Sequence, residues 1–218
     1  MLIQQIDTIL LHMTYVPDIA PHIARSSLGR NQGQATLYRV ELEDGTVGYG
    51  DAMGGPTDVS GFVGRHAVSG LRDIVHGGVQ MACYDAVGKA LGLPAHALMG
   101  RQVRQQVPYA YWTIDLPPDL FAAQAKHAAS LGYRTFKFKC RPWWDPMEQI
   151  EQASQVVPEG FAFWLDFNGH LREVRQALPI LNALSQFDCV GGFESPIPQR
   201  DAEGYRMLRR KIDRPIAA

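Results

Sequence analysis

The sequence has 218 residues, of which 46% are hydrophobic and 20% are charged, a composition that excludes disorder as the main state. Lys and Arg total 21 against 22 for Asp and Glu, so no basic excess favours nucleic acid or a membrane surface as a partner. We find neither a signal-peptide pattern nor an apolar run of about 18 residues, the length that spans a membrane. The three cysteines lack metal-type spacing, and we therefore expect a cytoplasmic protein.

The first hundred residues predict a β-hairpin followed by a helix. Residues 37–43 alternate between apolar and polar, Asp44 and Gly45 are typical of a hairpin turn, and residues 2–11 are a plausible third strand. A helix is expected from about residue 79 to 91, with small residues at every fourth position that permit close packing. The polar segment 17–35 predicts a long loop, either functional or merely mobile.

From residue 107 onward, predicted strands and helices alternate with a period close to 27 residues. Strands begin near residues 107, 134, 161, 188 and 214, and each interval contains a predicted helix. Such a period indicates βα units and a parallel sheet, either doubly wound or closed as a (β/α)8 barrel. The sequence has no glycine-rich nucleotide loop after the first strand, which disfavours the doubly wound alternative.

The length decides how much of a barrel is present. Eight units at this period require about 216 residues, whereas 112 remain from residue 107 onward. We therefore predict an α+β domain over residues 1–106 and an incomplete parallel (β/α) barrel of the TIM type over residues 107–218. The second domain would hold four βα units and the start of a fifth strand.

Polar residues stand late in three predicted strands, where buried strands are normally apolar. Lys137 and Lys139 end one strand, Asp166 and Asn168 the next, and Glu194 the third, so that Lys139, Asp166 and Glu194 follow one another at steps of 27 and 28 residues. This spacing places one charged group of each unit at the carboxyl edge of the sheet, where α/β enzymes bind ligands. Each residue alone is more typical of a solvated strand end, but together they predict a site.

The residue types suggest a chemistry. Two carboxylates and an amide suit a hard cation such as Mg²⁺. A lysine beside a second cation is expected to have a lowered pKa and to accept a proton more readily near neutrality. A base and a metal together can remove a proton from a carbon next to a carboxylate, because the metal stabilises the enediolate that results.

Five motifs give the chain a resemblance to the enolase superfamily, of the mandelate racemase/muconate lactonizing type. They are DGTVGYG, the helix QMACYDAVGKALGLPAHALMG, the K-x-K of FKFK, the D-x-N of WLDFN, and E-S-P in GFESP. The resemblance covers nearly the whole chain. It implies an N-terminal α+β capping domain, a (β/α)7β barrel, and Mg²⁺ bound by carboxylates at the ends of barrel strands three, four and five.

The resemblance also implies roles for single residues. Asp166 and Glu194 resemble the first two metal ligands. Lys139 resembles the general base, and Lys137 its electrostatic neighbour. Asn168 resembles the polar companion of the first ligand.

Other residues receive weaker assignments. The 17–35 loop resembles the loop that closes over the substrate, where His22, Arg25 or Arg30 would reach a substrate group. Trp112 stands one repeat before the base; it either lines the substrate pocket or only packs at the barrel mouth. The sequence departs from the family at position 195, where Ser replaces the more frequent Glu or Gln.

We therefore expect the N-terminal part of a Mg²⁺-dependent dehydratase, racemase/epimerase or cycloisomerase, that is, a lyase or isomerase. Its substrate would be a small carboxylate such as an acid sugar, and the residues present do not separate the three reactions. The third metal ligand is expected beyond Ala218, so the chain alone is predicted to be inactive. The open sheet edge of a half barrel predicts self-association, and we expect a homo-oligomer.

Two alternatives remain. The first is a non-catalytic half-barrel relative, an assembly or binding protein in which two copies cover each other's edges. The second is an unrelated α/β binding protein with coincidental strand-end charges.

Overall fold

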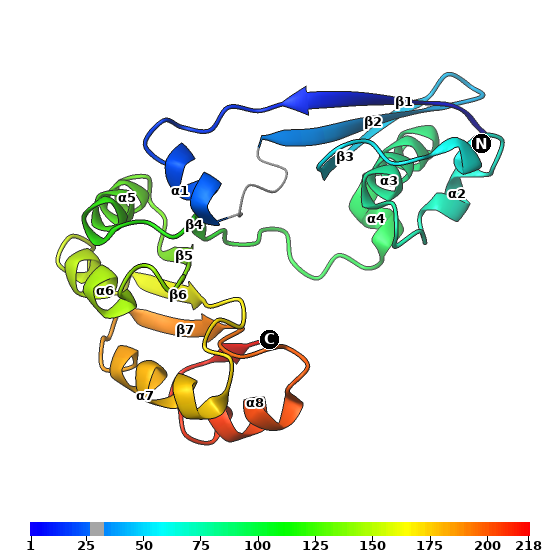
Figure 1. The fold of residues 1–218 in the computed structure, drawn as a ribbon. Coiled ribbons are helices and arrows are strands. Elements are labelled where there is room, and N and C mark those ends of the chain that lie inside the picture. Colours follow the sequence, from blue (N-terminus) through cyan, green and yellow to red (C-terminus); the bar gives the residue numbers. More distant parts are fainter. Residues whose placement is uncertain (27–32) are drawn as a thin grey trace. The chain divides into compact units, whose positions relative to one another are not determined.

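The structure is a computed structural model that describes residues 1–26 and 33–218, and it divides into two compact units (Figure 1). Unit 1 contains Met1–Ala20 and the described part of Ser27–Val107. Unit 2 contains Pro21–Ser26 and Pro108–Ala218. Each unit is described by itself below.

Unit 1 is built on a three-stranded antiparallel sheet. Its strands are β1 (Ile3–His12), β2 (Gln34–Leu42) and β3 (Val47–Met53), in the spatial order β1-β2-β3. The predicted hairpin joins β2 to β3, and Gly45 in its turn has a φ of 82°, a conformation that glycine adopts without steric cost. The hairpin and its pairing with the N-terminal strand are thus as the alternation predicts.

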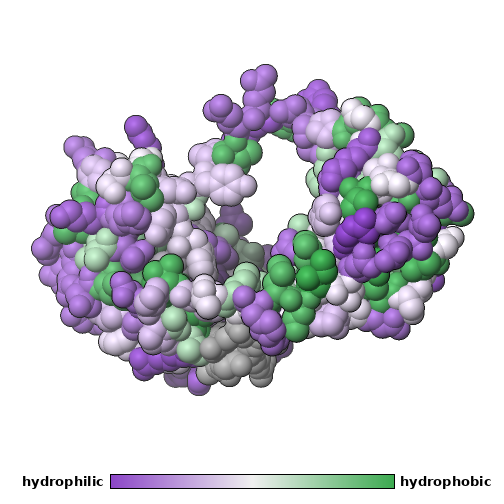
Figure 2. Space-filling model, turned by 90° about the horizontal axis from the view of Figure 1, so that it is seen from above, coloured by the Kyte–Doolittle hydropathy of each residue, from purple (hydrophilic) through white to green (hydrophobic). Residues whose placement is uncertain are grey.

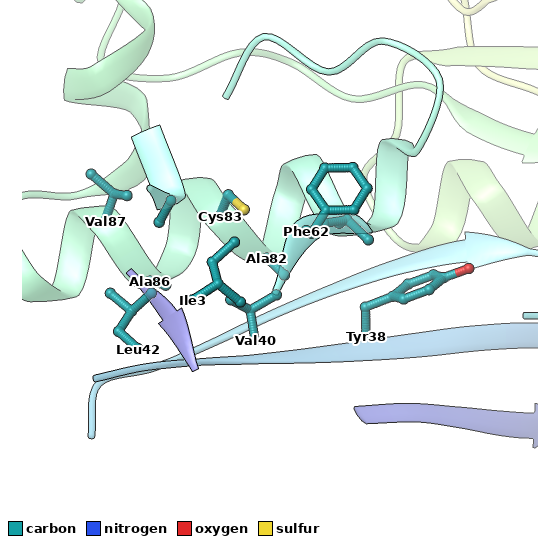
Figure 3. Close-up of a cluster of buried hydrophobic side chains, with 11 residues drawn as sticks. Ile3, Tyr38, Val40, Leu42, Phe62, Ala82, Cys83, Ala86 and Val87 are labelled. Carbon is teal, nitrogen blue, oxygen red and sulfur yellow. The ribbon is translucent and has the colours of Figure 1, made fainter. Parts of the chain in front are cut away.

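The core of unit 1 lies between this sheet and helix α3 (Gly77–Leu91), as Figure 3 shows. Alternate residues of β2 point toward the helix, and Tyr38, Val40 and Leu42 are all buried. The helix presents small side chains to them, including Ala82 and Ala86.

The close approach of α3 to β3 requires glycine on the strand. A Cβ added to Gly50 would lie 2.1 Å from the carbonyl oxygen of Gly78, and one added to Gly48 would lie 2.2 Å from that of Ala82. The small residues that recur along the helix therefore do permit the close packing that the sequence predicts.

Short helices complete unit 1 and correct one expectation. They are the 3₁₀ turn η1 (Ser60–Phe62), α2 (Ala67–Gly70) and α4 (Ala95–Met99). The segment predicted as a long loop over residues 17–35 contains helix α1 (Ala20–Ser26). The apolar positions of this helix are too few for a clear helical period, which is why the sequence pattern missed it.

Unit 2 is a five-stranded parallel sheet with consecutive neighbours in chain order. Four of its strands begin within two residues of the predicted positions, whereas the first begins at Tyr111 and not near residue 107. The five strands are β4 (Tyr111–Thr113), β5 (Thr135–Lys139), β6 (Ala162–Asp166), β7 (Val190–Glu194) and β8 (Ile216–Ala217).

A helix follows each of the first four strands of unit 2, as the period predicts. Two helices have the predicted N-caps, because Asp145 accepts a hydrogen bond from the backbone amide of Met147 and Asp201 accepts one from that of Gly204. The helices are α5 (Pro118–Ser130), α6 (Pro146–Ser154), α7 (Val174–Leu184) and α8 (Ala202–Arg209).

All four helices cover the same face of the sheet (Figure 1), which decides between the two closures. Phe136 and Phe138 of β5 are fully buried under the helices, and the ring centroids of Phe138 and of Phe121 in α5 are 4.2 Å apart. The alternate residues Lys137 and Lys139 lie on the uncovered face and are partly exposed. A doubly wound sheet would carry helices on both faces, so the arrangement is that of an incomplete barrel.

The surface carries isolated hydrophobic side chains. Figure 2 shows hydrophobic residues in patches among hydrophilic ones on the face that it presents. The most exposed are Ile74, Tyr109 and Val103, with 91%, 83% and 81% of their surface accessible. Among the described residues, no helix is both long enough and apolar enough to cross a membrane.

Candidate active site

Three charged residues form one row across the sheet of unit 2. The parallel register pairs Lys139 with Asp166 and Asp166 with Glu194. Each is the last residue of its strand. Because parallel strands end at a common edge, their side chains meet there, on the face that the helices leave uncovered.

Lys137 and these three residues form a continuous ion-pair network. The Nζ atom of Lys139 lies 2.5 Å from Oδ2 of Asp166. The Nζ atom of Lys137 lies 3.2 Å from the same oxygen and 2.7 Å from Oε2 of Glu194. The Asp166 side chain is fully buried, whereas the other three are 19–27% exposed.

The network sets the charge states of two of its members. Burial raises the pKa of Asp166, but the ammonium of Lys139 and the backbone amide of Asn168 outweigh burial and hold this pKa below its ordinary value. Burial lowers the pKa of Lys137, but hydrogen bonds to Glu194 and Asp166 outweigh it and the pKa is raised. Lys137 therefore keeps its charge beside the predicted base, because it contacts two carboxylates.

Asn168 and Ser195 continue the chain beyond the two carboxylates, and both have a φ of 45°. Left-handed backbone at two adjacent strand ends is a form of local strain that is common at functional sites. The backbone amide of Asn168 donates to Oδ1 of Asp166 at 2.9 Å, and its side-chain Oδ1 accepts from Nη2 of Arg141 at 2.7 Å. A cavity of about 300 Å³ lies beside both residues, with Gln199 also in its lining.

The remaining predicted residues lie in varied places. Trp112 is 51% exposed and stands in register with Lys137, so its strand brings it beside the network. The guanidinium of Arg25 lies over the rings of Trp143 and Trp144, 5.0 and 5.4 Å from their centroids, which is a cation–π arrangement. Arg30 lies outside the described residues.

Arg141 is the residue that sequence reasoning missed. Its position, two residues after Lys139, places it on the same side of the chain by simple alternation, and that signal was available. Sequence reasoning also missed the buried, hydrogen-bonded pair of Asp115 and Gln149. Asp115 is 1% exposed, accepts a hydrogen bond from Nε2 of Gln149 at 3.2 Å, and has a pKa raised by burial to about 7.

The donor set fits a divalent cation only in part. Asp166 and Glu194 already hold one positive charge between them, the ammonium of Lys137. Paired carboxylate oxygens that share a cation are ligands of the kind that Mg²⁺ prefers. Within the described residues, however, no three His, Cys, Asp or Glu side chains come together as a metal site. The site therefore offers two carboxylate ligands.

Comparison with known proteins identifies similar sequences and folds. Residues 120–218 match the family model described as "Enolase C-terminal domain-like". A probable glucarate dehydratase from Streptomyces coelicolor is 50% identical over 127 residues, which cover 49% of this chain and 29% of that protein. A D-galactonate dehydratase from Pectobacterium atrosepticum is 29% identical over 151 residues, which cover 65% of this chain and 39% of that one.

A solved structure extends the likeness to both units. The dipeptide epimerase from Enterococcus faecalis, complexed with Mg and the dipeptide L-Leu-L-Tyr, has a TM-score of 0.76 at 20% identity and covers 99% of this chain and 67% of its own. The fold is thus that of an α+β capping domain followed by part of a TIM-type barrel. The muconate lactonizing enzyme from Pseudomonas putida has a similar fold, with a TM-score of 0.72 at 21% identity, and it is covered to 65% of its length. The chain spans less than two fifths of the curated relatives that it matches.

Proposed function

We propose that this chain carries the base and two metal ligands of a Mg²⁺-dependent enzyme that removes the proton next to a substrate carboxylate. The observation that carries the proposal is the network of Lys137, Lys139, Asp166 and Glu194 at the carboxyl edge of the sheet. Similarity to dehydratases of glucarate and galactonate supports a small acid sugar as the substrate. Dehydration, racemisation or epimerisation, and cycloisomerisation all begin with this step.

Each residue has a role in the proposal. Lys139 accepts the proton at Nζ, and its contact with buried Asp166 fixes the position of that atom. Lys137 keeps its charge, because two carboxylates lie against it, and so adds positive potential for an anionic substrate. Asp166 and Glu194 would hold Mg²⁺, which supplies charge neutralisation for the substrate carboxylate when bound. Asn168 orients Asp166 through its backbone amide.

Several finer points remain predictions of the sequence. They are the third metal ligand beyond Ala218, the inactivity of the chain alone, its homo-oligomeric state and its cytoplasmic location. The roles of Trp112 and Arg25 toward the substrate, and the domain boundary near residue 106, are proposals of the same kind.

The test is binding of an acid sugar to the full chain. Saturation-transfer NMR with D-glucarate should show binding that depends on Mg²⁺ and is lost in Asp166→Asn, whereas Lys139→Met should retain binding but abolish any exchange of the α-proton with deuterium from the solvent. If D-glucarate binding is the same with and without Mg²⁺ and is unchanged in Asp166→Asn, the proposal is contradicted. If the chain is in addition a homogeneous dimer by size-exclusion chromatography, the non-catalytic half-barrel becomes the better description.

A further inference from the structure

Arg141 is a positive charge without a neutralising partner beside the candidate active site. Its Nη2 atom donates to the side-chain oxygen of Asn168 at 2.7 Å, and its Nη1 atom donates to the carbonyl oxygen of Cys140 at 3.2 Å. Both acceptors are neutral. Among the described residues, no carboxylate lies at ion-pair distance from this guanidinium, although Asp166 and Asp115 are near enough to influence it.

The environment of Arg141 makes this lack of a partner costly. The side chain is half-buried, and burial lowers its pKa. A desolvated guanidinium has lost water and keeps free N–H donors in a fixed planar fork, which matches the two oxygens of a carboxylate. Such a group is stabilised when an anion arrives, so the arrangement favours an anionic ligand at this point.

The position of Arg141 relative to the base fixes which part of a ligand it would meet. It follows Lys139 by two residues, about 6.6 Å along an extended chain. Its partner Asn168 likewise follows Asp166 by two residues and lines the cavity of about 300 Å³. Arg141 therefore stands one step beyond the reacting groups, and through Asn168 it adjoins a cavity that Asn168, Ser195 and Gln199 line.

We infer that Arg141 binds a second carboxylate of the substrate, at the end opposite the reacting one, and so selects dicarboxylic acid sugars over monocarboxylic ones. The inference rests on the proposed function and names the substrate class for that same site. Arg141 would act as a specificity residue held in place by Asn168. It would neither transfer a proton nor contact the metal.

The experiment compares D-glucarate with D-gluconate, which differ in whether the sixth carbon is a carboxylate. Dissociation constants are measured by titration calorimetry with the full chain and Mg²⁺. The unmodified chain should bind D-glucarate about tenfold more tightly than D-gluconate, and Arg141→Gln should remove that preference by weakening only D-glucarate. Arg141→Lys should keep part of the preference, because it keeps the charge but loses the fork.

A matched control and the opposing outcomes complete the design. Arg175→Gln neutralises an arginine whose side chain is 86% exposed, and it should change neither constant. Equal binding of the two acids, or an unchanged preference in Arg141→Gln, would overturn the inference and leave the proposed function standing. Failure of both acids to bind in the presence of Mg²⁺ would overturn both. Thermal unfolding of each variant verifies that the chain is folded.

Discussion

The ammonium of Lys137 lies 2.7 Å from Oε2 of Glu194, although the two residues are 57 positions apart in the chain. The parallel register creates this contact, because β6 lies between their strands and contributes Asp166 to the same ammonium. One lysine thus joins the ends of three strands and separates two carboxylates that would otherwise repel each other. The Lys137 ammonium therefore contacts both carboxylates that the proposed function assigns to the metal, and it also stabilises the folded state of unit 2.

Removal of the Lys137 charge should destabilise unit 2 in the absence of divalent cations. Lys137→Met leaves the fully buried Asp166 with one cation fewer and exposes it to repulsion by Glu194. Allowing for the partial exposure of Lys137, we expect a loss of about 1–3 kcal/mol in the free energy of unfolding. Urea unfolding in EDTA at neutral pH measures it. Lys126→Met, at an exposed position of α5, is the control, and equal stability of the two variants would refute the prediction.

Asp115 should make stability fall as the pH rises. Its pKa is raised by burial to about 7 from its ordinary value of 3.8, so the folded state holds a proton that the unfolded state releases between about pH 4 and 7. The cost is fully present above pH 7 and absent below pH 4. Asp115→Asn cannot ionise, and we expect it to be about 1–3 kcal/mol more stable than the unmodified chain at pH 8 but not at pH 4.

The measurement for Asp115 is urea unfolding at both pH values. One oxygen of the Asp115 carboxyl and the side-chain oxygen of Gln149 have no hydrogen-bond partner among the described residues. The amide group of the asparagine can supply a donor there, which supports the expected gain. Asp119→Asn, on an exposed position of α5, should show no such pH-dependent difference. A pH-independent effect of Asp115→Asn would argue against the raised pKa.

Unit 1 should tolerate no side chain at Gly50. A Cβ there would lie 2.1 Å from a backbone carbonyl oxygen of α3, so the helix and the sheet must move apart. We expect Gly50→Ala to cost more than about 2 kcal/mol, and Gly55→Ala, where nothing lies within 4 Å, to change stability by less than about 0.5 kcal/mol. Thermal unfolding of the two variants tests the pair. Similar melting temperatures would show that the contact between α3 and β3 is more adaptable than the structure indicates.

The regular elements could be read from the sequence because local patterns determine them. The alternation around β2 and the cap residues Asp145 and Asp201 are signals within a few positions of the elements that they define. The 27-residue period likewise reflects units that each bury one helix on one strand. Helix α1 escaped because it is short and carries few apolar residues.

The contacts within the site were less accessible. Their alignment at one edge follows from the strand-end positions, but the sequence alone does not say that Lys137 bridges two carboxylates, which raise its pKa. The interaction of Arg141 with Asn168 depends on how two loops bend after their strands, including the left-handed φ of 45° at Asn168. Such bends depend on contacts between βα segments that are far apart in the chain.

The central claim is that Asp166 and Glu194 bind a divalent cation, and the most direct measurement is a titration of the full chain with Mn²⁺ followed by electron paramagnetic resonance. The bound ion loses its free-solution signal, so the dissociation constant is obtained without any substrate. We predict that Asp166→Asn and Glu194→Gln each weaken binding about tenfold or more, whereas Glu203→Gln on the exposed face of α8 leaves it unchanged. Equal Mn²⁺ binding by all four proteins would contradict the account.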